Sequence, residues 1–141
     1  MSLSLLIVDD SSSMRKVLKK AVNMCGISSL HILEAANGVE ALEVVKNEWV
    51  DLIFTDINMP QMDGLMFIEK MHEKGLLTQT PIIIITSEKR EEELMKLKNT
   101  RAYSVITKPF RVEEIKENLV NIFGEEIFHE SEDEEFEGSD F

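Results

Sequence analysis

The sequence is poor in cysteine, tryptophan, tyrosine and proline, and it has no long apolar run. Its single cysteine, Cys25, cannot form an internal disulfide, so a reducing cytoplasm is the expected compartment. Purely apolar runs such as residues 82–85 are far too short to span a membrane. The first residues also lack the charged and apolar regions of a signal peptide. We therefore expect a cytoplasmic protein with no membrane segment.

The chain has 141 residues, a length that predicts one domain with a single core. Its net charge of −12 argues against direct binding to nucleic acid or to anionic lipid. Residues 125–141 hold nine acids and no Lys or Arg, so that only −3 of this charge belongs to residues 1–124. We predict a folded domain over residues 1–124 and a separate acidic tail over residues 125–141.

The acidic tail has two interpretations, which the sequence leaves open. A block of like charge is usually solvated, and most of this tail fits that description. However, apolar residues interrupt the acids at Ile127, Phe128, Phe136 and Phe141. The alternative is therefore that the tail docks on a basic or apolar patch of a partner or of the domain itself.

Two kinds of apolar segment alternate along residues 1–124. Short runs predict strands over residues 3–8, 29–35, 50–55, 81–86 and 102–107. Apolar residues at helical spacing predict helices from the serines at 11–13 to Gly26, over 38–49, from Leu65 to Gly75, over 88–99 and from Val112 to Ile122. The run PIIIIT has no polar alternation, which predicts a strand covered on both faces. Strand and helix alternate five times, so we predict an α/β domain with a parallel sheet between two helical layers.

Polar residues gather where the predicted strands end. In a parallel sheet with helices on both faces, ligands bind at the carboxyl ends of the strands. Those ends supply carboxylates, hydroxyls and an amine, namely Asp9, Asp10, Asp56, Thr86, Ser87 and Lys108. Carboxylates at a spacing of roughly 5 Å repel one another by about 3 kcal/mol a pair at an effective dielectric constant near 20. One lysine cannot offset that repulsion, whereas Mg²⁺, which prefers oxygen ligands, can.

A site with Mg²⁺, Lys108 and Thr86 favours an anion, and a phosphoryl group is the anion that suits Mg²⁺ chemistry. No cysteine or activated serine pairs with a histidine in this sequence, which leaves a carboxylate as the available nucleophile. Asp56, at the end of the run VDLIFT, is the central candidate. The competing interpretation is that some of the acids are helix caps or surface residues, and Asp10 taken alone fits it.

Five segments together resemble a known family. They are LLIVDDSSSMRKVL, EAANGVEAL, DLIFTDINMPQMDG, PIIIITSE and TKPF, in this order and at the family's spacing. The sequence is similar to the receiver domains of two-component response regulators, and most of all to their single-domain, chemotaxis (CheY-like) members. The resemblance implies a flavodoxin-like (βα)5 fold with a doubly wound, parallel, five-stranded sheet of order 2-1-3-4-5.

The resemblance also implies a role for the residues at the strand ends. Asp56 corresponds to the aspartate that accepts the phosphoryl group. Asp9 and Asp10 correspond to the acidic pair that holds Mg²⁺ together with Asp56. Thr86 corresponds to the hydroxyl that turns toward the phosphoryl group, and Lys108 to the lysine that pairs with it.

Further positions follow from the same comparison. The backbone carbonyl of Asn58 is expected to be another Mg²⁺ ligand. The side chains of Asn58 and Glu88, with Ser87 beside them, are expected to modulate the hydrolysis of the acyl phosphate. A cis peptide bond is expected before Pro109, because only bonds to proline carry a small cis penalty.

The sequence departs from the family at the position of a switch residue. Many receivers carry an aromatic residue three positions before the lysine, but here that position is Val105. Tyr103 lies two residues earlier, on the same face of the predicted strand. Tyr103 is either a displaced switch residue or, as we favour, a packing residue. Trp49 is also predicted to be a packing residue.

The predicted function is signalling by a stand-alone receiver, with autocatalytic phosphotransfer and autodephosphorylation, rather than the activity of an enzyme. The implied partners are a sensor histidine kinase as phosphodonor and a downstream protein. The latter would bind the face formed by the fourth helix, fifth strand and fifth helix. The flagellar switch of chemotaxis is the first candidate, and a phosphorelay intermediate or phosphate sink outside chemotaxis is the second. We expect a monomer.

Two rival classes are weaker. An Mg²⁺-dependent phosphohydrolase with an aspartyl nucleophile usually has a second Asp two residues later as a general acid, but here that residue is Asn58. A flavin-binding module would need hydroxyls and amides around its phosphate. Asp9 and Asp10 would instead repel a phosphate in the absence of a metal.

Overall fold

The computed structural model describes residues 2–129, which form one five-stranded parallel sheet in the order β2-β1-β3-β4-β5. The strands are β1 (Leu3–Val8), β2 (Leu30–Ala35), β3 (Leu52–Thr55), β4 (Ile82–Thr86) and β5 (Ser104–Thr107). The helices are α1 (Ser12–Asn23), α2 (Gly38–Asn47), α3 (Gly64–Glu73), α4 (Glu91–Lys98) and α5 (Val112–Phe123), followed by the short 3-10 helix η1 (Glu125–Ile127). The predicted fold class and strand order are confirmed.

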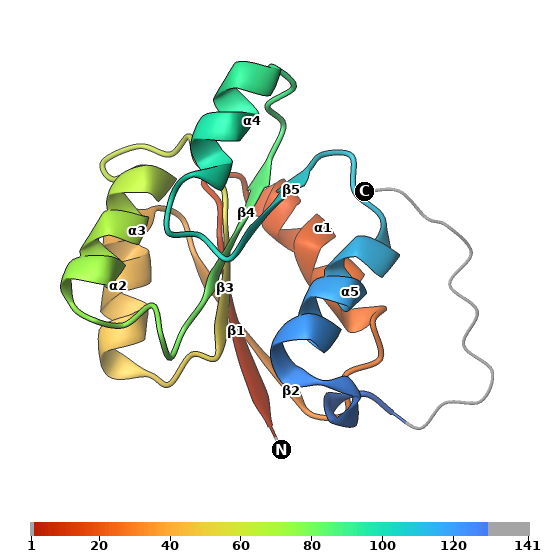
Figure 1. The fold of residues 1–141 in the computed structure, drawn as a ribbon. Helices are drawn as coiled ribbons and strands as arrows, with labels where there is room; N and C mark the ends of the chain where they lie inside the picture. The colour runs from red at the N-terminus through yellow and green to blue at the C-terminus, as the bar shows by residue number, and fades with distance from the viewer. Residues whose placement is uncertain (1, 130–141) are drawn as a thin grey trace.

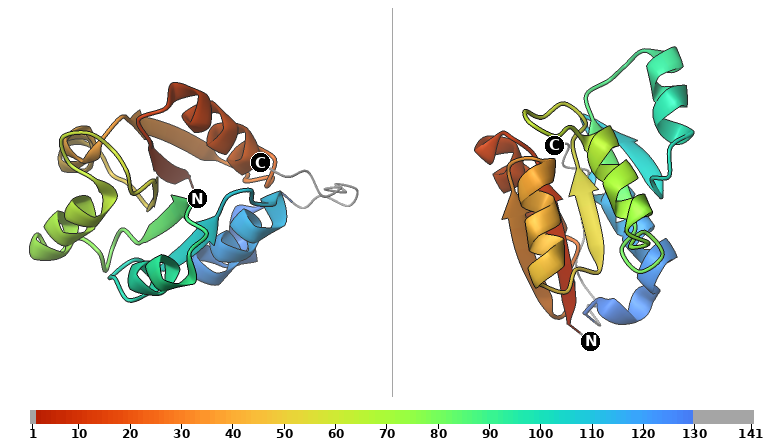
Figure 2. Two further views of the ribbon diagram at one scale, coloured as in Figure 1. Left: turned by 90° about the horizontal axis from the view of Figure 1, so that it is seen from above. Right: turned by 90° about the vertical axis from the view of Figure 1, so that its left-hand side faces the viewer.

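Helices cover both faces of the sheet (Figures 1 and 2), so the core has two halves. The half beneath α1 and α5 includes Leu5, Ile7, Phe54, Leu18 and Leu119. The half beneath α2, α3 and α4 includes Leu6, Val8, Ile53, Phe67 and Leu97. Strands β3 and β4 are buried along their whole length, as the unbroken apolar run of β4 predicted.

Polar side chains cap the helices that begin at the carboxyl ends of the strands. The Ser11 hydroxyl accepts the N–H of Met14 at 3.2 Å, and the Asp63 carboxylate accepts the N–H of Met66 at 2.9 Å. These caps satisfy backbone donors that have no partner within the helix. They fix the start of α1 beside Asp9 and the start of α3 after the loop that follows Asp56.

The predicted first helix was too long. Helix α1 ends at Asn23, and Gly26 follows in the turn with a φ of 82°. Cys25 lies in this turn but is buried in the core, which raises the pKa of its thiol to about 12. The apolar spacing continued past the last helical residue because the turn itself packs against the core.

Two expected packing residues, Trp49 and Tyr103, are exposed instead. Trp49 is 66% exposed, and its ring N–H donates to the Asp51 carboxylate at 2.8 Å. Tyr103 precedes β5 rather than lying within it and is 49% exposed, so neither its predicted strand position nor its packing role is correct.

The packed part of the chain continues past Gly124. In η1, Ile127 is only 3% exposed and belongs to the core half beneath α1 and α5. Ile27 and Phe128 form an isolated antiparallel bridge, which ties this segment to the turn after α1. The rest of the predicted tail, including Phe136 and Phe141, lies outside the described residues. Within residues 2–129, no helix combines the length and apolar character needed to span a membrane.

Candidate functional site

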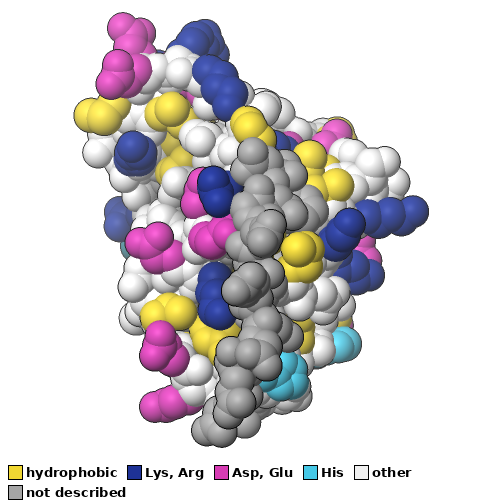
Figure 3. Space-filling view, turned by 90° about the vertical axis from the view of Figure 1, so that its right-hand side faces the viewer, with side chains coloured by type: hydrophobic (Ala, Val, Ile, Leu, Met, Phe, Trp, Pro, Cys, Tyr) yellow, Lys and Arg dark blue, Asp and Glu magenta, His cyan; other side chains and the backbone are white. Residues whose placement is uncertain are grey.

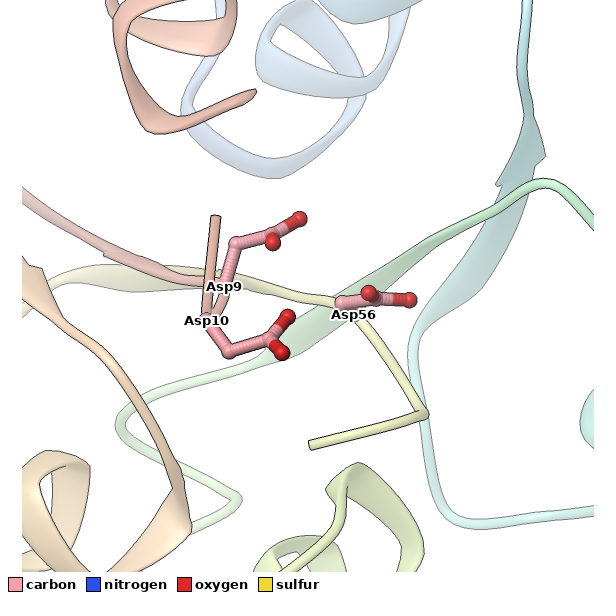
Figure 4. A group of neighbouring side chains, drawn as sticks. All are labelled: Asp9, Asp10 and Asp56. Carbon is pink, nitrogen blue, oxygen red and sulfur yellow. The ribbon is translucent and has the colours of Figure 1, made fainter. Parts of the chain in front are cut away.

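Three carboxylates meet at the carboxyl ends of two neighbouring strands. Strand β1 is followed by Asp9 and Asp10, and β3 by Asp56. Parallel pairing sets Val8 opposite Thr55, and the Asp56 N–H donates to the Val8 carbonyl at 2.9 Å. Carboxylate oxygens of the three aspartates lie within 4.8 Å of one another, and Figure 4 shows the side chains together beyond the strand ends.

Asp9 is the most buried of the three, at 2% exposed. Its carboxylate accepts the Ser11 N–H at 2.9 Å and lies 3.7 Å from the Lys108 ammonium. The pKa of Asp9 is nevertheless raised, chiefly because burial removes water from the charged form. The charges of Asp56 and Asp10 raise it further. The hydrogen bond from Ser11 and the charge of Lys108 therefore offset only part of the free-energy cost of burying the ionised carboxylate.

Asp56 is half-buried and Asp10 is exposed, so the cluster opens to solvent on one side. The Asp56 carboxylate accepts only the N–H of its neighbour Ile57, at 2.7 Å, among the hydrogen bonds of the described residues. The donor set consists of oxygen atoms, carries excess negative charge and leaves positions for water. Such a set suits a hard divalent cation, and Mg²⁺ in particular keeps several of its waters.

The loop after Asp56 is held against the site by Gly64. A Cβ at this position would lie 2.3 Å from the Asp56 carbonyl oxygen, closer than any side chain tolerates. The Gly64 N–H donates to the Ile57 carbonyl at 2.8 Å. The first residue of α3 can therefore pack directly on the backbone that carries Asp56.

The ends of β4 and β5 complete the site. Thr86 is buried, and its hydroxyl oxygen accepts the Glu88 N–H at 3.1 Å. The Lys108 N–H donates to the Thr86 carbonyl at 2.7 Å, which fixes the two strand ends side by side. The bond between Lys108 and Pro109 is cis, as the resemblance implied. Ser87 is exposed at the edge of the site.

A groove of about 280 Å³ adjoins the acidic cluster. Its lining includes Asn58, Thr86, Glu88, Arg90 and Leu97. Arg90 contacts Glu88 through two side-chain nitrogens, at 2.9 and 3.1 Å. This contact, with the N–H of Arg90, lowers the pKa of Glu88 to about 2. The two predicted modulators, Asn58 and Glu88, thus line one groove beside Asp56.

Sequence reasoning missed three basic residues around the site. Arg15 donates to the Asp9 carbonyl at 2.6 Å, Arg90 holds Glu88, and Lys89 donates to the Lys108 carbonyl. All three bind backbone or neighbouring acids rather than the cluster of three carboxylates. The only signal for Arg15 was its place one turn inside the helix that follows Asp9 and Asp10.

The two residues considered for the switch differ in environment. Val105 lies on β5, is half-buried and packs against the core half beneath α4. Tyr103 lies before the strand with about half of its surface exposed. No hydrogen bond of the described residues links the Tyr103 hydroxyl to Thr86, and the Val105 side chain has no polar atom.

Comparison with known proteins decides the family. The model of the response regulator receiver domain family matches residues 5–120. The chain belongs to this family. Two curated relatives are a chemotaxis protein CheY homolog of Campylobacter jejuni, 37% identical, and the chemotaxis protein CheY1 of Helicobacter pylori, 36% identical. Both alignments span 123 residues and cover 86% of this chain, with 93% and 98% of the respective relatives.

Solved structures agree with this assignment. The chemotaxis protein CheY4 of Vibrio cholerae superposes with a TM-score of 0.74 at 29% identity, covering 87% of this chain and 100% of that one. The chain is thus a CheY-like receiver domain of two-component phosphorelay signalling. Receiver domains are phosphorylated on aspartate and bind Mg²⁺ through an acidic cluster, and Asp9, Asp10 and Asp56 form such a cluster here.

Proposed function

We propose that Asp56 is the residue of this receiver that accepts a phosphoryl group from the phosphohistidine of a sensor kinase. The observation that supports this assignment most strongly is the group of three carboxylates with oxygens within 4.8 Å of one another, flanked by Lys108. Among them, Asp56 combines partial exposure with a position at the end of the central strand β3. Asp9 is too buried to meet a partner protein, and Asp10 lies at the rim.

The transfer is a displacement at phosphorus. A carboxylate oxygen of Asp56 attacks the phosphorus atom, the bond from phosphorus to the histidine nitrogen breaks, and its electron pair stays on the imidazole, which then takes up a proton. Asp9, Asp10, Asp56 and the backbone carbonyl of Asn58 would hold Mg²⁺. The bound cation supplies neutralisation of negative charge on the transferring group.

Lys108 and Thr86 act on the phosphoryl group from the other strand ends. The Lys108 ammonium lies 3.7 Å from the Asp9 carboxylate. From this position it can form an ion pair with an oxygen of the phosphoryl group instead. The Thr86 hydroxyl uses its oxygen to accept the Glu88 N–H, so its proton remains available for donation. The contacts of Lys108 and Thr86 with the phosphoryl group form only when Asp56 is phosphorylated. They therefore shift the loop between β4 and α4 toward a second conformation.

Hydrolysis resets the site, when water attacks phosphorus and the bond to the Asp56 oxygen breaks. Asn58 and Glu88 line the groove through which water reaches this position, and Ser87 is exposed beside it. Glu88 is ionised at neutral pH, as its ordinary pKa of 4.5 already requires, and Arg90 lowers that pKa further, to about 2. We infer that these side chains set the rate at which the acyl phosphate is hydrolysed. We also infer that Val105, on β5, and Tyr103, just before it, change position when Thr86 moves.

Output passes to a downstream protein through the face formed by α4, β5 and α5. This face presents Met95, 56% exposed, and Tyr103. Exposed apolar side chains of this size are typical of protein-binding surfaces. The two curated relatives are chemotaxis proteins, which supports the flagellar switch as the target. We propose that the chain is a cytoplasmic monomer.

The test is the intact mass of the full chain after incubation with acetyl phosphate and Mg²⁺. We expect one added phosphoryl group on the wild type and none on the Asp56→Asn variant or after chelation of the metal. The Asp51→Asn variant is a matched control, because this residue lies at the other end of the same strand, and it should be phosphorylated normally. Absence of both the adduct and of beryllofluoride binding on the wild type would contradict the proposal.

A further inference from the structure

Helix α1 is the one helix of the described chain that carries basic residues and no acids. It holds Arg15, Lys16, Lys19 and Lys20, in a protein with a net charge of −12. Arg15 and Lys19 face the edge strand β2, where both pair with Glu34, at 3.0 and 3.1 Å. These two cations therefore have ion-pair partners within the folded domain.

Lys16 and Lys20 have no such ion-pair partner among the described residues. They lie four residues apart, so they are neighbours on one side of the helix. Both are exposed, and neither forms an ion pair or a hydrogen bond with any residue in the range 2–129. Figure 3 views the α1 and α5 side of the molecule, where Lys and Arg side chains stand out from the surface. We call this pair the α1 lysine row.

The described chain ends beside this helix. The His129 N–H donates to the Gly26 carbonyl at 2.8 Å, and the Ser28 N–H donates to the Ile127 carbonyl at 2.8 Å. Ile127 is buried in the core, and the Lys116 ammonium lies 4.9 Å from the centre of the Phe128 ring. Residues 125–129 thus anchor the chain three residues beyond the end of α1.

Twelve residues follow this anchor, and their composition complements the lysine row. They include the seven acids Glu130, Glu132, Asp133, Glu134, Glu135, Glu137 and Asp140, with no Lys or Arg. An extended segment of this length reaches roughly 40 Å, whereas α1 is only about 18 Å long. The anchor gives the segment a high effective concentration at α1, so that the weak ion pairs formed by two exposed lysines favour docking.

We propose that residues 130–141 dock along α1 in the same molecule, with their acids on the α1 lysine row. The inference rests on two lysines without a partner in residues 2–129, the anchor at Gly26, the reach of the segment and the opposite charges. It does not depend on the phosphorylation proposed above. The docked segment covers this side of α1 and competes with any acidic partner for it, and it is released as salt screens the charges.

The experiment uses the full chain with a nitroxide label at Ser139→Cys and NMR observation of backbone amides. Cys25 is buried and does not take the label, which intact mass verifies. We expect the amides of residues 14–22 to lose intensity relative to the reduced label. The loss should disappear at about 1 M salt, where the screening length falls to roughly 3 Å.

Two variants identify the surface. Lys16→Glu with Lys20→Glu should abolish the effect, whereas Lys46→Glu with Lys74→Glu should not. The second pair consists of exposed lysines at the groove between α2 and α3, and it is a matched control. Should the first pair impair folding, neutralising Glu132, Asp133, Glu134 and Glu135 to their amides provides the same test with α1 unchanged.

Several results would overturn the proposal. One is intensity loss centred on α4 or on the groove between α2 and α3. Another is the absence of any loss at low salt. A third is loss seen only when labelled protein is mixed with a separate isotope-labelled copy, which would assign the docking to a second molecule.

Discussion

Two aspartates bracket strand β3, and their environments are opposite. Asp51, at the amino end, accepts the Ser4 N–H at 2.8 Å and the Trp49 ring N–H at 2.8 Å. Within residues 2–129, Asp56, at the carboxyl end, accepts only the N–H of the next residue, and it faces two further carboxylates. An aspartate therefore stabilises the fold at the amino end of β3, whereas an aspartate at the carboxyl end adds electrostatic repulsion between carboxylates.

The difference teaches where chemistry can reside in this fold. A carboxylate whose acceptor sites are filled by protein donors has little left for a ligand. At the carboxyl edge the protein leaves negative charge in excess, so a cation and a phosphoryl group can bind with favourable energy.

The largest effect should come from Gly64→Ala. A Cβ would meet the Asp56 carbonyl at 2.3 Å, so either the strand end or the start of α3 must move. We expect a loss of about 2–4 kcal/mol in the free energy of unfolding, measured by urea denaturation, together with slower phosphorylation. Gly38→Ala is the control, because the three atoms nearest to its Cβ all belong to the side chain of Met62 and none to the backbone. Equal losses in both variants would contradict the close packing inferred at Asp56.

Asp51→Asn should weaken the structural end of β3. The amide can accept one of the two hydrogen bonds but lacks the charge that strengthens both, so we expect a loss of about 1–2 kcal/mol on unfolding. Fluorescence of Trp49, the single tryptophan, should shift because its ring N–H loses a charged partner. An unchanged stability would show that this aspartate is not structural.

Asp9→Asn should increase the free energy of unfolding in metal-free buffer, whereas Asp51→Asn should decrease it. Burial raises the pKa of Asp9, so the folded state binds its proton more tightly than the unfolded state. The wild type therefore loses stability as pH rises from the ordinary value of 3.8 through the raised folded value. We expect the variant to gain on the order of 1 kcal/mol at neutral pH but nothing in strong acid. Calorimetry that found the variant less stable at neutral pH would contradict this sign.

Glu34→Gln should give the smallest effect. Lys19 first, and then Arg15, lower the pKa of this carboxylate on the edge strand. Its stabilisation is present above the ordinary pKa of 4.5 and is lost as pH falls through the lowered value. Because the pairs are partly exposed, we expect a loss of about 0.5 kcal/mol at neutral pH, with none in strong acid. A pH-independent difference, measured by urea titration, would exclude the ion pairs as its cause.

The sequence was sufficient for the fold and for the grouping of Asp9, Asp10 and Asp56, because both follow from local patterns. The apolar run of β4 predicted a buried strand, and the acids after β1 and β3 had to meet once the sheet was parallel. Trp49 and Tyr103 were mispredicted for a common reason. An apolar side chain near a helix or strand end fits the pattern of burial, whereas its exposure depends on tertiary packing.

Contacts between distant segments were beyond the sequence. The backbone donor to Asp51 is Ser4 of β1, 47 positions away, and nothing in the string VDLIFT indicates it. The bridge between Ile27 and Phe128 joins residues about a hundred positions apart. Within the predicted acidic tail, the apolar pair Ile127 and Phe128 was the signal, and the structure places Ile127 in the core.

The central claim is that Asp56, rather than another carboxylate, carries the phosphoryl group. The most direct measurement is reduction of the phosphorylated full chain with borohydride, which converts an aspartyl phosphate to homoserine, followed by peptide mass spectrometry. We predict homoserine at position 56 alone, and only when Mg²⁺ was present during phosphorylation. Homoserine at position 9, 10, 51 or 63 with an intact Asp56 would contradict the account.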